Sequence, residues 1–233
     1  MIDGTLPGYW DNKVANFTAA NGTQAKVLVD VSPAQVAAAI VGEAALPGEA
    51  SVRQRVMTGG CRVIDGLISS SDAAAKSVAV WQGVQASLYA NMGAPTITTL
   101  NTVNRTAGSF VDDGYSVGDS CMLFGATTAA NDGVLAQVTA VAALSLTFNG
   151  TPFTNEASAA GFRVVRVGRA KQIAVPANAG SSDSVSSVSL LLGAQTDSTG
   201  IQLGANGMLI VGLVAAASAL PAQVSVSANV GLY

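Results

Sequence analysis

Two adjacent aspartates, Asp112 and Asp113, and the nearby Asp119 are the side chains whose spacing could support chemistry. Paired carboxylates can act as general acids and bases, and clustered carboxylates bind Ca²⁺. The surrounding sequence, GSFVDDGYSVGD (108–119), is rich in glycine and has no EF-hand spacing. Aspartates in such turns commonly accept hydrogen bonds from their own backbone. We therefore expect a structural turn here, with cation binding by Asp112 and Asp113 as the open alternative.

Histidine is missing from all 233 residues. Its absence removes every Ser-His-Asp or Cys-His relay and every metal site that needs an imidazole ligand. The chain also lacks a Gly-x-Ser-x-Gly elbow and a glycine-rich phosphate loop between a strand and a helix. The sequence therefore predicts no catalytic residue, no cofactor site and no metal site, and we expect a protein that is not an enzyme.

The two cysteines, Cys61 and Cys121, lie far apart in the sequence. Without a dense cysteine framework, we expect both to be free thiols buried as small hydrophobic residues. A disulfide would require their Cα atoms to lie within about 7 Å, and the sequence leaves that alternative open.

Charge is scarce throughout the chain. Charged residues make up 11% of it, against about 25% in ordinary soluble proteins, and the formal net charge is −3. A weakly acidic chain is not expected to bind nucleic acid. The longest apolar stretch, 208–220, is too short to span a bilayer as a helix, and residues 1–4 do not resemble a signal peptide. Because interface cores are depleted in charge, the composition predicts a homo-oligomer, either a dimer or a trimer.

Aromatic and basic residues near the N-terminus are the candidate partner-interface residues. Residues 1–25 are punctuated by glycine, proline and asparagine, which predicts a loop-like arm carrying Tyr9 and Trp10. Aromatic residues on an arm often anchor in a neighbour's pocket, although the arm could equally fold back on its own core. Arg53 and Arg55 lie on one face of a predicted strand, 51–57, where we expect a solvated or interface-rim role.

The same role is expected for the three arginines near residue 166. Arg163 and Arg169 are spaced to share one face of a strand, and Arg166 would point to the other face.

The outer parts of the chain read as short strands separated by turns, a pattern typical of a β-sandwich. One helix is expected at 33–45, where Ser32 and Pro33 provide an N-cap and a first helical residue. Residues 224–230 alternate between apolar and polar side chains, and 208–217 are nearly all apolar, as in a strand buried on both faces. The remaining predicted strands are 26–31, 61–69, 76–81, 172–175 and 188–192.

A second unit is predicted between the two outer parts. Asn131-Asp132-Gly133 and Asn149-Gly150 are strong turn signals within it. Its predicted strand segments are 96–105, 108–119, 120–126, 134–148 and 161–167. Together these patterns predict an all-β chain: a split, jelly-roll-like sandwich formed by 1–95 and 170–233, with a small antiparallel β-barrel, 96–169, inserted into it.

Several stretches resemble modules of tailed-bacteriophage virion proteins, above all head decoration (cement) proteins. They are 52–81 (VRQRVMTGGCRVIDGLISSSDAAAKSVAVW), 108–150 (GSFVDDGYSVGD and onward), 175–180 (VPANAG) and 190–219 (LLLGAQTDSTGIQLGANG and onward). The resemblance implies a virion structural protein that is assembled in the host cytoplasm and lies on the capsid exterior. Its partner would be the major capsid protein, whose neighbouring subunits it would clamp after shell expansion.

Other functions fit the sequence less well. A phage tail component (tube, baseplate or receptor-binding protein) is the main alternative, but neither a long ring-forming hairpin nor a fibrous stem is evident. A cell-wall hydrolase is disfavoured by the missing histidine and by only two Trp and four Tyr residues to line a glycan cleft. A bacterial surface adhesin is disfavoured by the missing signal peptide.

Overall fold

The computed structural model describes residues 11–19, 23–31, 61–85, 92–157, 162–181, 183–190, 201–204, 206–218 and 221–232. These residues form mainly antiparallel strands joined by turns, with few helical residues, among them the 3-10 helix η2 (Ala129–Asn131), so the predicted all-β class is confirmed. The helix predicted at 33–45 and the strand predicted at 51–57 lie outside the described residues. The chain divides into two compact units: the first unit is 1–81 with 170–233, and the second unit is 82–169.

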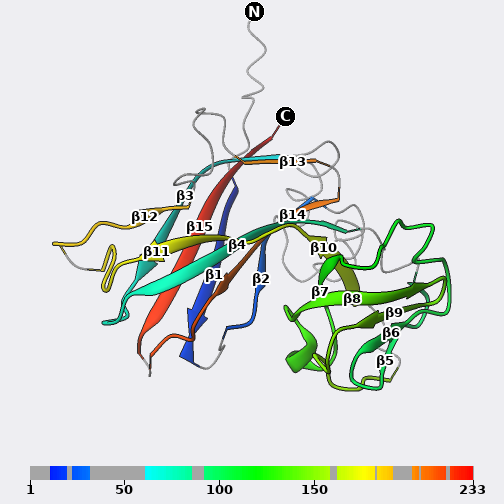
Figure 1. The fold of residues 1–233 in the computed structure, drawn as a ribbon. Coiled ribbons are helices and arrows are strands. Elements are labelled where there is room, and N and C mark those ends of the chain that lie inside the picture. The colour runs from blue at the N-terminus through cyan, green and yellow to red at the C-terminus, as the bar shows by residue number, and fades with distance from the viewer. Residues whose placement is uncertain are drawn as a thin grey trace, which may run out of the picture. The chain divides into compact units, whose positions relative to one another are not determined.

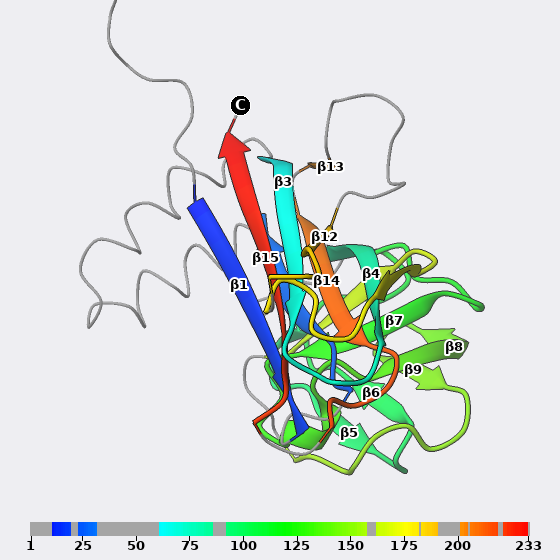
Figure 2. The ribbon, with the colours of Figure 1, turned by 90° about the vertical axis from the view of Figure 1, so that its left-hand side faces the viewer.

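One layer of the first unit is an antiparallel sheet in the order β1-β15-β3-β12, with β13 also paired to β3 (Figure 1). The long strands β1, β15 and β3 run side by side, as Figure 2 shows. The strands of this layer are β1 (Asp11–Thr18), β3 (Cys61–Ser70), β12 (Val188–Ser189), β13 (Ile201–Leu203) and β15 (Gln223–Leu232).

The other layer has the order β2-β14-β4, and β11 pairs with the first half of β4. Its strands are β2 (Lys26–Asp30), β4 (Lys76–Gln85), β11 (Lys171–Val175) and β14 (Gly207–Leu213). All seven residues of β14 are buried, which confirms a strand covered on both faces.

Alternate side chains of the two layers meet in one core, so the first unit is a β-sandwich. β15 shows the expected period of two, because its buried valines and alanine alternate with polar residues. The core side chains include Phe17, Val63, Ile68, Val224, Val226, Ala228 and Val230 from one layer, and Leu28, Val78, Val80, Ile173, Leu209 and Val211 from the other.

The prediction that residues 1–25 form a loop-like arm is wrong for Asp11–Thr18, which form β1. This strand pairs with β15 along its whole length, from Asp11 opposite Val230 to Thr18 opposite Gln223. The sequence gives a weak signal here, because only Ala15 and Phe17 supply buried apolar side chains among polar neighbours. Pairing with β15 supplies the backbone hydrogen bonds that the local sequence does not predict.

The second unit contains the antiparallel strand order β10-β7-β8-β9-β6-β5, which continues the sheet of β2, β14 and β4 because the end of β4 pairs with β10. Residues 82–95, which the sequence assigns to the sandwich, group with this unit. The jelly-roll topology of the first unit and the closure of the second into a barrel stay predictions. The strands are β5 (Thr96–Thr98), β6 (Thr102–Asn104), β7 (Ser120–Phe124), β8 (Leu135–Ala142), β9 (Ser145–Phe148) and β10 (Arg163–Val167).

Three strand predictions in the second unit need correction. Residues 134–148 form two strands, β8 and β9, joined by a turn that has neither glycine nor proline. Residues 96–105 form the hairpin of β5 and β6, whose turn residues Thr99 and Leu100 both have positive φ, 52° and 62°. The segment 108–119 consists of turns and loop. Positive φ is costly for threonine and leucine, so the sequence does not predict the turn at Thr99 and Leu100.

Candidate functional site

None of the four residues predicted for a partner interface lies in the described part of the chain. Tyr9, Trp10, Arg53 and Arg55 all fall outside it. The structure therefore neither brings these residues together nor separates them.

The aspartates at 112–119 lie in a turn that is closed by their own neighbours. A carboxylate oxygen of Asp113 lies 2.5 Å from the Arg105 guanidinium, and Asp119 Oδ2 accepts a hydrogen bond from the Ser116 N–H at 2.8 Å. Asp112 is exposed, and its N–H donates to Ser109 Oγ. Among the described residues, no group of three acidic, cysteine or histidine side chains is arranged to hold a metal ion.

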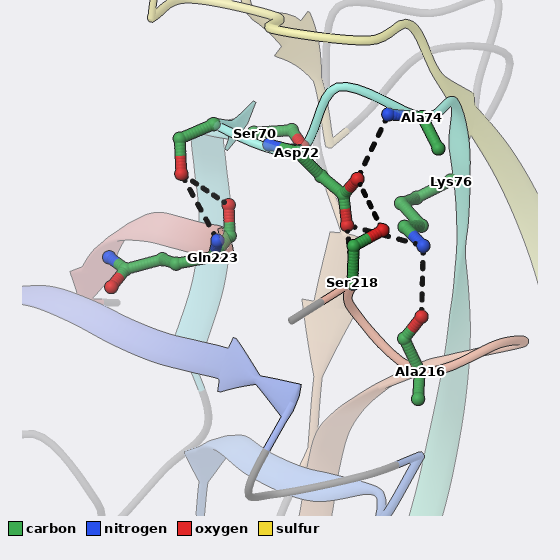
Figure 3. A network of polar contacts seen from close by, with 8 residues as sticks. Ser70, Asp72, Ala74, Lys76, Ala216, Ser218 and Gln223 are labelled. Atoms are coloured by element: carbon green, nitrogen blue, oxygen red, sulfur yellow. Dashed lines mark hydrogen bonds and ion pairs between the residues drawn. The ribbon is translucent and has the colours of Figure 1, made fainter. Parts of the chain in front are cut away.

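The most completely bonded carboxylate of the first unit is Asp72, which follows β3 and is fully buried (Figure 3). Its Oδ1 accepts hydrogen bonds from the Ala74 N–H at 2.9 Å and from the Ser218 hydroxyl at 2.8 Å. Its Oδ2 accepts the Ser218 N–H at 2.7 Å and lies 3.2 Å from Lys76 Nζ. Lys76 Nζ also donates to the Ala216 carbonyl, so one carboxylate ties the β3–β4 turn to the segment after β14.

Asp72 is held in its charged form. Burial alone would raise the pKa of this carboxyl group. The hydrogen bonds from Ser218 and Ala74 and the contact with Lys76 outweigh burial, so the pKa lies well below its usual range. Every oxygen lone pair that could act on a substrate is directed at the protein itself, which makes Asp72 a structural residue.

Glu156 has the same role in the second unit. Its Oε1 accepts the Thr127 N–H at 2.6 Å, and its Oε2 accepts the Thr128 N–H at 3.2 Å and the Asn131 side-chain amide at 2.8 Å. The side-chain oxygen Oδ1 of Asn131 in turn accepts the Thr154 N–H. Burial opposes ionisation of Glu156, but these hydrogen bonds lower its pKa. The carboxylate therefore fixes the loop between β7 and β8.

Arg163 corrects the expectation of a solvated or rim role. It is buried, and its guanidinium donates to the side-chain oxygen of Gln85, itself buried, at 3.0 Å. Arg166 donates to the Gly114 carbonyl and lies over the Tyr115 ring at 5.4 Å. Arg169 lies beyond the end of β10, so it does not share a strand face with Arg163.

Both cysteines are free and buried, as expected from their isolation in the sequence. Burial, reinforced by Asp30, raises the pKa of Cys61 to about 11. Burial, with a smaller contribution from Asp119, raises the pKa of Cys121 to about 12. A thiol that stays protonated is a poor nucleophile, so neither residue is suited to covalent chemistry at neutral pH.

The exposed side of the sheet β1-β15-β3 is the strongest candidate for an interaction surface, and we call it the outer face. Its side chains alternate with the buried core residues of the same strands. One row across it places Val14, Ser227 and Leu67 opposite one another, and Val14 and Leu67 are 58% and 47% exposed. The outer face comprises Val14, Asn16, Arg62, Asp65, Leu67, Ser69, Ser225, Ser227 and Asn229, of which Arg62 and Asp65 are charged.

The polar residues of the outer face bond to one another. The Ser225 hydroxyl lies 2.6 Å from the Asn16 side-chain oxygen, and the Gln223 amide donates to the Ser225 oxygen at 2.9 Å. Ser227 Oγ donates to the Leu67 carbonyl. These short side chains give a flat surface that can be covered with little loss of side-chain entropy.

The edge of the same sheet is less accessible. In the described residues, β1 pairs with β15 on one side only, which leaves its other edge without a strand partner. Lys26 Nζ donates to the Asn16 carbonyl there and lies 5.0 Å from the centre of the Phe17 ring. A lysine at a strand edge disfavours addition of a further strand. A partner would therefore meet the outer face rather than the edge.

Sequence reasoning missed the outer face because it missed β1. The alternation in 224–230 was the available signal, since it requires one solvent-facing row on β15. No helix in the described residues is long and apolar enough to cross a membrane. No protein-family profile, curated protein or solved structure shows a significant match to this chain.

Proposed function

We propose that this chain is a non-enzymatic virion structural protein that binds the outside of a tailed-phage capsid and clamps neighbouring capsid subunits. The outer face is the contact surface in this proposal. The observation that supports it most is the scarcity of charge on that face, where Arg62 and Asp65 are the charged side chains among those described. A surface with so little charge can be buried against a neighbour without desolvating ion pairs.

The size of the outer face fits a contact that is weak on its own. Three strands of about eight residues, spaced about 4.8 Å apart and rising about 3.4 Å per residue, present roughly 400 Å². A standard stable interface buries about 800 Å² on each partner. Repeated seating on a capsid lattice, together with contacts between sister copies, would raise the avidity without any tighter single contact. Binding only the assembled shell would stabilise that shell by mass action.

Buried charged groups support a structural role rather than catalysis. Asp72 and Glu156 are bonded on both carboxylate oxygens by protein donors. Arg105 and Arg163 are also buried and bonded. Asp72, Glu156 and Arg105 bond to loop residues, whereas Arg163 of β10 bonds to Gln85 of β4.

The decisive experiment is the copy number per particle, measured by quantitative mass spectrometry of purified virions against the major capsid protein. A copy number comparable to that of the capsid subunit is the expected result. A low copy number, such as that of one ring or one vertex, would indicate a tail or portal protein and overturn the proposal. Absence from the particle would overturn every virion role.

Two matched variants test the contact surface itself. Leu67→Lys places a charge on the outer face, whereas Leu144→Lys places one in the second unit at a leucine of similar exposure, 47% against 51%. We expect Leu67→Lys to lower the copy number about tenfold or more, because a buried unpaired charge costs several kcal/mol. Leu144→Lys should leave it unchanged. Full occupancy by Leu67→Lys would remove the outer face from the proposal.

A further inference from the structure

Two Asn-Gly pairs in the described residues, Asn149-Gly150 and Asn206-Gly207, differ sharply in their surroundings. The first pair follows β9, and Gly207 of the second pair begins β14. Gly150 and Asn206 have positive φ, 68° and 62°. Asn-Gly is the dipeptide most prone to deamidation, because glycine has no side chain to hinder attack by its backbone nitrogen. Local structure decides whether that attack can occur.

The Asn149-Gly150 pair lies in an exposed turn with free space around it. Both residues are exposed, and a Cβ on Gly150 would meet no atom within 4 Å. The only bond that anchors the pair is from the Asn149 N–H to the Gln137 carbonyl, at 2.8 Å, within the described part of the chain. That bond leaves both reacting groups, the Asn149 side-chain amide and the Gly150 N–H, without a hydrogen-bond partner among the residues described.

The Asn206-Gly207 pair is held by a backbone hydrogen bond and by close packing. The Gly207 N–H donates to the Gly204 carbonyl at 2.9 Å, and a Cβ on Gly207 would lie 2.8 Å from that same oxygen. The side-chain oxygen of Asn206 is buried. Attack by the Gly207 nitrogen would require breaking this hydrogen bond at a buried glycine, which is costly.

We propose that Asn149 is a spontaneous deamidation site and that Asn206 is protected. The Gly150 nitrogen forms a bond to Asn149 Cγ, the bond from Cγ to the side-chain nitrogen breaks, and ammonia leaves with the proton of the Gly150 N–H. Water then opens the resulting succinimide to aspartate or isoaspartate. The product carries one more negative charge, which changes the formal net charge from −3 to −4. A protein in a long-lived particle would accumulate this charge at one exposed turn.

The test is peptide mapping by mass spectrometry of the intact, full-length protein during incubation at mildly alkaline pH. We expect Asn149 to deamidate at least about tenfold faster than Asn206, since the buried bond must open first at the second site. In denaturant the two rates should become similar. Equal rates in the folded protein, or an Asn149 that stays intact while the denatured protein deamidates, would overturn the proposal.

A variant separates the chemistry from the fold. Gly150→Ala hinders attack by the nitrogen, and its methyl group meets no atom within 4 Å, although alanine at a φ of 68° strains the turn by about 1 kcal/mol. Deamidation of Asn149 should be markedly slower than in the wild-type protein. In denaturant, the deamidation rate of Asn206 should be the same in the variant and in the wild-type protein. Undiminished deamidation at Asn149 in this variant would contradict the proposed route.

Discussion

The two units of this chain stabilise their interiors in different ways. The core of the first unit is aliphatic, with Phe17 as its one aromatic side chain among the described residues, and strand residues supply most of it. The core of the second unit contains five aromatic residues, Phe110, Tyr115, Phe148, Phe153 and Phe162. Two edge-to-face pairs, Phe110 with Tyr115 and Phe148 with Phe153, have ring centres 5.4 and 5.2 Å apart.

Polar groups are also distributed differently. The second unit buries Arg105, Asn131 and Glu156, which bond to its loops, and Gln85 and Arg163, which link β4 to β10. In the first unit Ser70 and Asp72 are the buried polar residues among those described, and they lie together at one end of β3. The comparison teaches that long strands can define a core by alternation, whereas short strands with long loops need aromatic bulk and buried hydrogen bonds to define theirs.

The strongest way to break this comparison is to remove an aromatic side chain from the second unit. Phe148→Ala should lower the free energy of unfolding by about 4 kcal/mol, through lost burial and the cavity left beside Phe153. Ile68→Val in the first unit is the control and should cost about 1 kcal/mol. Urea denaturation measures both. A Phe148→Ala loss no larger than that of the control would show that the aromatic cluster is not the main support of the second unit.

The next largest effect is expected at the carboxylate of the first unit. Asp72→Asn removes the charge beside Lys76 and should cost about 3 kcal/mol, because the donors around it stay buried. Asp112→Asn, at an exposed position, should change stability by less than about 0.5 kcal/mol. Hydrogen exchange should place the loss in the first unit. Equal effects of the two substitutions would refute the structural role of Asp72.

Asp72 should also make the first unit acid-sensitive. Its pKa is lower in the folded state than in the unfolded chain, so its contribution is fully present above the unfolded value of about 3.9. The contribution is lost as pH falls below that value towards the lower folded pKa. Wild-type stability measured at pH 7 and pH 3 should therefore fall more than that of Asp72→Asn. The same drop in both proteins would assign the acid sensitivity to other groups.

Glu156→Gln tests the corresponding carboxylate of the second unit. The substitution keeps the shape but replaces one acceptor oxygen by a donor that faces N–H groups, at a cost of about 2 kcal/mol. Hydrogen exchange should increase in the loop between β7 and β8 and not in the first unit. An increase spread over both units would mean that the two interiors are not stabilised separately.

The smallest effect is expected at the strained hairpin. Leu100→Gly should raise stability by about 0.5 to 1 kcal/mol, because glycine adopts φ of 62° without steric cost. Leu144→Gly, at the other exposed leucine turn, should instead lower stability, since Leu144 does not have positive φ. Thermal unfolding distinguishes the two. A gain in both variants would contradict the strain argument.

The sequence predicts the long, regular strands of the first unit well. Alternation identifies β15, and continuous apolar character identifies β14, because the apolar pattern of a strand indicates which of its faces are buried. It does not predict β1, whose pairing depends on a strand about 200 residues away. Nor does it identify Asp72 as a structural residue, since Ser218, 146 positions later in the sequence, completes its hydrogen bonds. The outer face depends on both long-range pairings and was therefore missed.

The pairing of β1 with β15 also determines when the sheet can form during synthesis. Asp11 lies opposite Val230, so the first described strand has no partner until 219 further residues have been added. At about 5 to 20 residues per second, that delay is roughly 10 to 45 s on the ribosome. The outer face includes residues from both strands, so a nascent or prematurely ended chain does not present it. If the proposed virion role holds, only chains that contain β15 could use the outer face to bind a particle.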